Sequence, residues 1–248
     1  MSDGIELQVD TLGVGPPILW LPGGPGLGNY LHPVAQAFPG FSNILPDPRG
    51  TGRSNGQPHS LAVAVQDLED LRQTLGFDRW VVLGHSWGAD LALAYGLAHG
   101  GTVTSIVSFA GTGVQNDRDW HAAYTARLRE EPHGDYQQSP DVQRQLIEDW
   151  RRFIKNADLL ARIAALQMPI TFLHSANDIR PGWPAQQLAN LVPRGSYLEL
   201  AKAPHEAWLT HHDALVRALG EILDAGGRTY SEERARPDPV GRVDSSSA

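Results

Sequence analysis

The sequence predicts an α/β fold in which a mostly parallel sheet is flanked by helices. Strand signals and helix signals alternate along the chain, which is the pattern of strands joined by helical crossovers. Several apolar runs also end directly in glycine-rich or polar turns, as expected for buried parallel strands. This rhythm is interrupted once, between residues 111 and 167, where strand signals cease.

The expected elements follow from local pattern. Residues 5–9 are typical of a short edge strand, and residues 18–21 and 43–46 are apolar runs that stop at proline-containing turns. Residues 61–75 place Val65, Leu68, Leu71 and Leu75 at helical spacing, which predicts an amphipathic helix. Further strands are expected at 81–83, 105–109, 170–173 and 196–200, and a closing helix at about 206–223.

The interrupted stretch is predicted to be a short helical cap. Residues 118–131 and 140–167 are rich in Gln, Arg and Glu and read as helices. We therefore expect a core formed by residues 1–110 and 168–225, a cap at 111–167, and a flexible C-terminal tail at 226–248. Trp120, Tyr124, Trp150 and Phe153 in the cap either line a substrate pocket or hold the cap to the core.

The most informative segment is Gly84-His85-Ser86-Trp87-Gly88, between an apolar strand and an Ala/Leu-rich helix. This Gly-x-Ser-x-Gly pattern, in that context, is typical of a strained turn that presents a serine hydroxyl as a nucleophile. Ser86 is therefore the predicted nucleophile, and His85 is expected to support packing inside the turn.

A serine needs a base, and the base needs an orienting carboxylate. In the chain order of such folds the acid precedes the histidine. Asp178 follows the strand at 170–173, and His205 follows the strand at 196–200, so both lie at carboxyl ends of strands. The sequence thus predicts a catalytic triad of Ser86, Asp178 and His205.

An oxyanion hole is expected from two backbone N–H groups. One belongs to Trp87, directly after the serine, and the other to Gly24, in the glycine loop after the strand at 18–21. Asp47 and Arg49 are expected to stabilise their own loop through polar contacts rather than to take part in chemistry.

Composition narrows the class of protein. The net charge of -8 argues against nucleic acid or an anionic membrane as a partner, and the chain has no cysteine. We find no metal-binding motif, no dinucleotide fingerprint and no signal-like or membrane-spanning run. The expectation is a cytoplasmic enzyme with a small-molecule substrate, no metal and no cofactor; its oligomeric state is not predicted.

Three segments carry a family resemblance. Residues 22–26 read Pro-Gly-Gly-Pro-Gly, residues 47–54 read Asp-Pro-Arg-Gly-Thr-Gly-Arg-Ser, and residues 84–88 form the Ser86 turn. Together they resemble the α/β-hydrolase family, most closely its proline iminopeptidase-like branch, over roughly residues 4–223. The resemblance implies the α/β-hydrolase fold and serine hydrolysis of a small amide.

The chain departs from that branch in two ways. Pro22 stands where the branch has a histidine in the oxyanion loop, so this loop must be braced differently, and the insertion is short. In the branch, acidic cap residues hold the free amino terminus of the substrate. Glu130, Glu131, Glu148 and Asp149 are available here, but none sits in a matching motif, and solvated helix faces are the favoured interpretation.

Three functional hypotheses remain at this stage. The first is a serine hydrolase acting through an acyl-enzyme on a small amide, with a carboxylesterase or lactonase as the close alternative. The second is a cofactor-free C–C bond hydrolase, which the same three residues permit. The third is a non-catalytic ligand-binding protein on the same fold, for which a broken triad would be the sign.

Overall fold

The computed structural model describes residues 1–114, 118–130 and 134–234. Seven strands form one sheet, which confirms the predicted fold class. The strands are β1 (Val9–Leu12), β2 (Pro17–Leu21), β3 (Ser42–Pro46), β4 (Trp80–His85), β5 (Val103–Phe109), β6 (Ile170–Ser175) and β7 (Gly195–Leu200).

The strand order is β1-β3-β2-β4-β5-β6-β7, and only β1 runs antiparallel to its neighbour. The edge strand predicted at residues 5–9 was placed too early. The paired register begins at Val9, opposite Pro46 at the end of β3, and before it only the Gln8 carbonyl is bonded across, to the Asp47 N–H at 2.9 Å.

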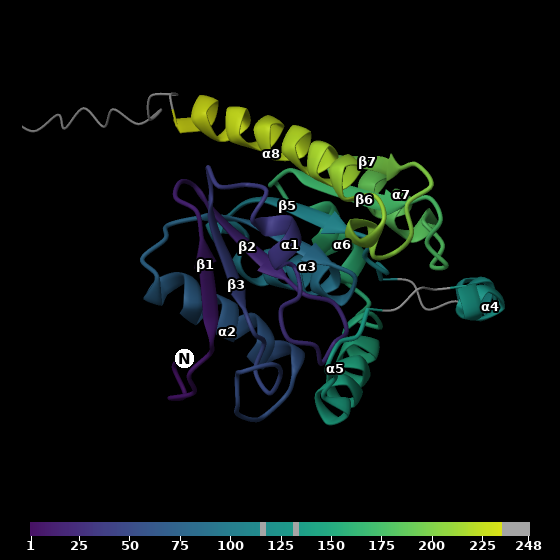
Figure 1. Ribbon diagram of the computed structural model, residues 1–248, viewed down its shortest axis with the longest axis horizontal. Coiled ribbons are helices and arrows are strands. Elements are labelled where there is room, and N and C mark those ends of the chain that lie inside the picture. The colour runs from purple at the N-terminus through teal and green to yellow at the C-terminus, as the bar shows by residue number, and fades with distance from the viewer. Residues whose placement is uncertain (115–117, 131–133, 235–248) are drawn as a thin grey trace, which may run out of the picture.

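Helices cover both faces of the sheet, as Figure 1 shows for α8 on one side and α2 on the other. The helices are α1 (His32–Ala35), α2 (Leu61–Thr74), α3 (Trp87–His99), α4 (Arg118–Arg127), α5 (Pro140–Phe153), α6 (Leu159–Ala164), α7 (Trp183–Leu191) and α8 (His212–Arg234), with short 3₁₀ turns η1 (Gly100–Thr102), η2 (Leu128–Glu130) and η3 (Ala207–Leu209).

Alternation along the strands divides the core into two layers. In β2, Leu19 and Leu21 join the cluster with α2, α3 and α7, whereas Ile18 and Trp20 join the cluster with α1 and α8. Because successive side chains of a strand point to opposite faces, a strand covered on both sides is apolar throughout. The continuous Ile-Leu-Trp-Leu run therefore predicted its position correctly.

The insertion is helical, as expected, but it is not a separate layer. Val142, Leu146 and Trp150 of α5 belong to the same buried cluster as α2 and α3. Asp149 also accepts a hydrogen bond from the Leu61 N–H at the start of α2, at 2.7 Å. The insertion therefore extends the core of the domain, while α4 contributes no buried residue.

The closing helix differs from its predicted bounds. It begins at His212 and continues to Arg234, beyond its predicted end at about residue 223, so the first residues of the predicted tail, 226–234, are helical. Glycine costs only about 1 kcal/mol in a helix, and no proline follows until Pro237. Residues 235–248 of the predicted tail lie outside the described residues. No helix in the described part of the chain is long and apolar enough to cross a membrane.

Candidate active site

The candidate site lies at β2 and β4, where the order in which the chain adds strands to the sheet reverses. The chain leaves β2 for β3 on one side and later returns to β4 on the other side of β2. The connections that follow β2 and β4 therefore run to opposite sides, and it is at such a point that open α/β sheets bind their ligands. These two loops carry the predicted oxyanion glycines and Ser86.

Ser86 sits in a backbone conformation that few side chains adopt. Its φ is 54° and its ψ is -122°, and its N–H donates to the Phe109 carbonyl at 2.9 Å. A Cβ on Gly84 would lie 2.0 Å from the Gly88 oxygen, and one on Gly88 would lie 2.2 Å from the Leu21 oxygen. Only glycines permit this approach of strand and helix, so the motif has the local geometry that the sequence predicted.

Asp178 and His205 are in direct contact. His205 Nδ1 lies 2.5 Å from Asp178 Oδ2, and the Asp178 side chain is fully buried. The loop after β6 thus meets the loop after β7, although 27 residues separate the pair. His205 also lies beside the Ser86 turn (residues 84–88), because its ring centroid is 4.5 Å from that of His85, which precedes Ser86. The structure therefore brings the three predicted residues to one edge of the sheet.

Asp178 is held in its charged form. Burial alone would raise the pKa of this carboxyl, but the neighbouring His205 and Arg180 lower it well below its usual range. The Arg180 backbone N–H and Nη1 donate to Asp178 Oδ1 at 2.9 and 3.2 Å. A charged Asp178 can only accept a hydrogen bond, so the proton of a neutral His205 ring lies on Nδ1 and points to Asp178. Nε2 of His205 is then the nitrogen that can act as a base.

The predicted oxyanion donors occupy suitable places. Trp87 is the first residue of α3, so its N–H has no partner inside the helix. Gly24 adopts a φ of 118°, which favours glycine, and lies on the exposed side of the loop. The neighbouring Gly23 is pressed against the nucleophile, since a Cβ there would lie 3.0 Å from Ser86 Cβ.

The four aromatic residues of the insertion fall into two pairs. Trp150 packs edge-on against Trp87 with ring centroids 5.5 Å apart and stacks on Phe153 at 5.1 Å. Trp120 stacks on Tyr124 at 5.4 Å in α4. The Trp150 pair therefore joins α5 to the core, whereas the α4 pair lies outside it.

The acidic residues of the insertion are largely occupied by other contacts. Asp149 binds the start of α2 and pairs with Arg152 at 2.6 Å, and Glu130 pairs with Arg127 at 3.0 Å. Glu148 is exposed, and Glu131 lies outside the described residues. Within the described ranges, no three His, Asp or Glu side chains gather as metal ligands would.

Helix α4 is tied to the loop that carries the acid. Arg127 Nη1 donates to the Asp178 carbonyl at 2.8 Å, and the Arg180 guanidinium lies 5.3 Å from the centre of the Tyr124 ring. Sequence reasoning did not assign either arginine a role. Arg127 carried little signal because arginines occur throughout the insertion, and Arg180 carried none beyond its place two residues after Asp178.

Two further residues at the site were missed. Tyr30 lies between the oxyanion loop and the Ser86 turn, bonded to Gly23 and His85. Glu206, directly after His205, is buried and accepts hydrogen bonds from the Gly134 N–H at 3.0 Å and the Tyr136 hydroxyl at 3.3 Å. A carboxylate adjacent to the predicted base was the only sequence signal for Glu206, and Tyr30 had none.

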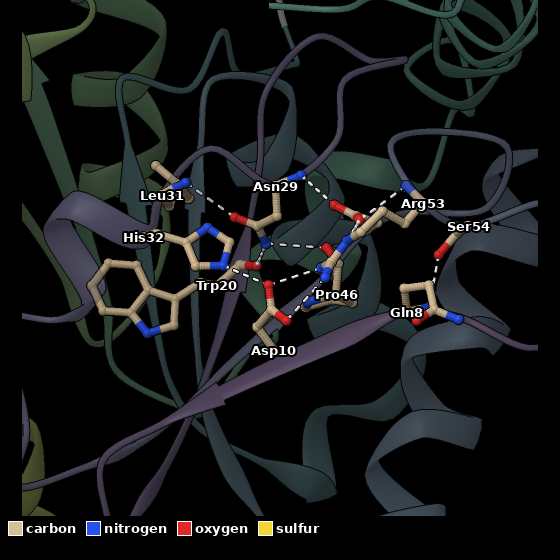
Figure 2. A network of polar contacts seen from close by, with 10 residues as sticks. Gln8, Asp10, Trp20, Asn29, Leu31, His32, Pro46, Arg53 and Ser54 are labelled. Carbon is tan, nitrogen blue, oxygen red and sulfur yellow. Dashed lines mark hydrogen bonds and ion pairs between the residues drawn. The ribbon is translucent and has the colours of Figure 1, made fainter.

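Asp47 and Arg49 stabilise loops, as predicted. Asp47 accepts hydrogen bonds from the backbone of Asn29 at 2.8 Å and of Arg53 at 3.0 Å. Arg49 pairs with the buried Asp67 at 2.5 Å. Figure 2 shows the surrounding network, in which Arg53 also reaches Asp10 on β1.

Comparison with known proteins now identifies the family. A family model described as alpha/beta hydrolase fold matches residues 16–166. The chain belongs to the α/β hydrolase family. The matched region contains the candidate oxyanion loop and Ser86, whereas Asp178 and His205 lie beyond it.

Curated relatives carry the name proline iminopeptidase. One from Xylella fastidiosa (strain Temecula1) is 34% identical over 171 residues, covering 62% of this chain and 52% of the relative. One from Xanthomonas citri is 44% identical over 92 residues, covering 33% and 28%. The chain thus matches about half, or less, of the length of these relatives.

Solved structures match over nearly the whole fold. A thermophilic esterase from Thermogutta terrifontis has a TM-score of 0.74 and 18% identity, covering 90% of this chain and 94% of that one. A meta-cleavage product hydrolase from Pseudomonas fluorescens IP01 has a TM-score of 0.72 and 19% identity, covering 90% and 95%. These likenesses concern the fold.

Proposed function

We propose that this protein is a serine hydrolase that forms an acyl-enzyme on Ser86 and acts on a small amide or ester. The observation that carries the proposal is the contact between His205 and the buried, charged Asp178 beside the strained Ser86 turn. A non-catalytic binding protein has no need of this arrangement.

The proposed mechanism uses each group in a defined step. His205 Nε2 removes the Ser86 hydroxyl proton as Oγ attacks the substrate carbonyl, and Asp178 stabilises the resulting imidazolium. The N–H groups of Gly24 and Trp87 stabilise the negative oxygen of the tetrahedral intermediate. His205 then protonates the leaving group, and it activates a water molecule that hydrolyses the acyl-enzyme.

The bond that is cleaved has two candidates. Relatives named proline iminopeptidase support an amide with an N-terminal proline or small residue. The contacts of the insertion favour an ester or lactone, because Asp149 and Glu130 are paired with arginines and Asp149 also binds α2. These two carboxylates are therefore not preorganised to receive a substrate ammonium group.

A fluorophosphonate probe tests the nucleophile without knowledge of the substrate. We expect stoichiometric labelling of the wild-type protein at Ser86 and no labelling of Ser86→Ala, since no other serine among the described residues has a positive φ. Ser54→Ala is a matched control, because Ser54 is also buried but bonds only loop backbone. Equal labelling of wild type and Ser86→Ala would refute the proposal.

Substrate profiling separates the amide from the ester. Prolyl p-nitroanilide, p-nitrophenyl butyrate and a short lactone would be compared at matched concentrations, with a vinylogous diketone as the test of C–C hydrolysis. A kcat/KM for the ester at least tenfold above that for the prolyl amide would assign an esterase. The reverse ranking would assign an aminopeptidase, and turnover of the diketone alone would overturn both.

A further inference from the structure

A chain of hydrogen bonds links the oxyanion loop to the catalytic histidine through Tyr30 and His85. The Gly23 N–H lies 2.7 Å from the Tyr30 hydroxyl oxygen, and that oxygen lies 2.6 Å from His85 Nδ1. On the other side of its ring, His85 Nε2 lies 3.1 Å from the His205 carbonyl oxygen. Three loops at the site are therefore connected through two side chains.

The proton positions in this chain are determined by chemistry. A carbonyl oxygen can only accept, so His85 Nε2 carries a proton. Burial lowers the pKa of His85 well below 6.5, so the ring is neutral and its Nδ1 is an acceptor. The Tyr30 hydroxyl must then donate to Nδ1 while it accepts from the Gly23 N–H. Burial also raises the pKa of Tyr30, which keeps this hydroxyl protonated.

Tyr30 is itself held on all sides. Its ring stacks between Tyr136 of the insertion at 4.5 Å and Trp208 near His205 at 5.4 Å. Its neighbour Asn29 donates from Nδ2 to the carbonyls of Trp20 at 2.8 Å and Pro46 at 3.1 Å, as Figure 2 shows. These contacts fix the position of the Tyr30 hydroxyl, so it does not move with the oxyanion loop.

The consequence falls on the peptide that contributes to the oxyanion hole. Tyr30 takes up the Gly23 N–H, so the next N–H in the loop, that of Gly24, is the one left for a substrate oxygen. Gly23 is confined between two groups, since a Cβ there would lie 2.5 Å from the Tyr30 oxygen and 3.0 Å from Ser86 Cβ. The position of Tyr30 therefore sets the distance between this loop and the nucleophile.

We infer that Tyr30 is a positioning residue that holds the oxyanion loop in its reactive geometry through the neutral His85. Pro22 cannot donate a side-chain hydrogen bond to brace the loop, and the Tyr30 hydroxyl supplies this brace from eight residues further along the chain. The role presupposes the acyl-enzyme chemistry proposed above, and Tyr30 acts on that chemistry only through Gly23 and His85.

The first experiment compares Tyr30→Phe with Tyr95→Phe. Both variants lose one buried hydroxyl and keep the ring, but Tyr95 bonds Glu69 on α2, at 2.8 Å, and makes no contact with the site. We expect fluorophosphonate labelling of Ser86 to slow about tenfold or more in Tyr30→Phe, because loss of one oxyanion donor itself costs about 100-fold or more. Tyr95→Phe should label within about twofold of wild type, even if it is less stable.

Two substitutions of His85 separate positioning from simple packing. The amide of Gln places its nitrogen near the position of Nε2, and the amide of Asn places its oxygen near that of Nδ1. His85→Gln should keep the bond to His205 and lose the acceptor for Tyr30, so it should slow labelling as Tyr30→Phe does. His85→Asn should keep the Tyr30 acceptor and slow labelling less. Equal rates for the two variants would contradict the inference, and this pair remains decisive if Tyr30→Phe does not fold.

A spectroscopic measurement tests the chain independently of catalysis. In the wild-type protein, ring ¹⁵N spectra should show His85 neutral with its proton on Nε2, and Tyr30→Phe should shift only the Nδ1 resonance. Failure of the wild type to label at Ser86 would refute the proposed function. Normal labelling of Tyr30→Phe, or an unchanged His85 Nδ1 resonance, would overturn the role of Tyr30 alone.

Discussion

The ring centroids of two buried histidines lie 4.5 Å apart at this site, and the two rings have different hydrogen-bond partners. His205 has a charged carboxylate at Nδ1, which places its proton there and leaves Nε2 basic. His85 has a tyrosine hydroxyl at Nδ1 and a carbonyl at Nε2, so both nitrogens are occupied. The partner at Nδ1, rather than distance from the serine, decides which histidine can serve as the base.

The same contrast separates two buried carboxyls. Asp178 faces His205 and Arg180, which lower its pKa, whereas the partners of Asp90 on α3 are the neutral hydroxyl and backbone of Thr112 and the Gly113 N–H. Burial raises the pKa of Asp90 to about 7, and these hydrogen bonds offset only part of that rise. Asp178 at the candidate site thus differs from Asp90 in having the cationic Arg180 as a partner, whereas Asp90 only holds the loop at Thr112 and Gly113.

Replacing the partner of the base should have the largest effect. Asp178→Asn offers an amide in place of a carboxylate, so His205 loses the acceptor that holds its proton on Nδ1. If the proposed mechanism holds, we expect kcat to fall by about 10,000-fold, the effect of the corresponding change in the triad of a serine protease. Steady-state kinetics on the best substrate of the panel would measure it.

The control for this change is another His–Asp pair. Asp213 lies 3.5 Å from His212 on the surface, with its side chain 92% exposed, so Asp213→Asn should leave kcat unchanged. A loss of less than tenfold in Asp178→Asn would mean that the carboxylate is not the partner that defines the base.

Asp90, the buried carboxyl without a cationic partner, should make the free energy of unfolding depend on pH. The pKa of Asp90 is about 7 in the folded protein and near 3.8 when unfolded. Between these values the folded state binds the additional proton, so the free energy of unfolding decreases as pH rises from about 4 to 7. Asp90→Asn, which keeps both hydrogen-bonding positions, should remove this decrease.

The expected gain of Asp90→Asn over wild type is up to about 4 kcal/mol at pH 8, and it should vanish near pH 4. Urea unfolding at several pH values would measure it. Asp119→Asn, at an exposed position of α4, serves as the control. A gap that stays constant with pH would show that Asp90 does not titrate in this range.

The smallest effect is expected for charges at the surface. Arg53 bridges Asp47 and Asp10, but its side chain is 53% exposed, so solvent screens both pairs. Arg53→Gln should lower the free energy of unfolding by about 1 kcal/mol or less, and the difference should shrink in 1 M NaCl. A loss of several kcal/mol that persists in salt would mean that this exposed network stabilises the fold as strongly as a buried ion pair such as Arg49–Asp67 does.

The site could be predicted where function imposes a local backbone pattern. The glycines around Ser86 are required by contacts near 2 Å, and such a requirement is visible in the sequence. Asp178 and His205 could be proposed because chain order and strand ends restrict where a partner of Ser86 can lie. The predicted fold class rests on the same kind of local signal, namely apolar runs that end in turns.

The remainder depends on contacts that no local pattern encodes. Tyr30 meets His85 across 55 residues of chain, and any aromatic residue in that loop would look alike in the sequence. Helix α7 was not predicted, and α8 continues through Gly226 and Gly227. For α7 a local signal did exist, because Pro184 stands in its first turn and Ala185, Leu188 and Ala189 recur at helical spacing, whereas nothing in the sequence around Gly226 indicates that α8 continues.

The hydrophobic cluster shared by α5, α2 and α3 limits how this protein can be re-engineered. Grafting the lid of another hydrolase in place of residues 111–167 would remove Val142, Leu146 and Trp150 from the interior, and each large side chain lost there costs several kcal/mol. Redesign of substrate preference is therefore a matter of point substitution rather than of module exchange. Helix α4, in which no residue is buried, is the segment where such substitutions leave the scaffold intact, as long as Tyr124 and Arg127, which contact the Asp178 loop, are kept.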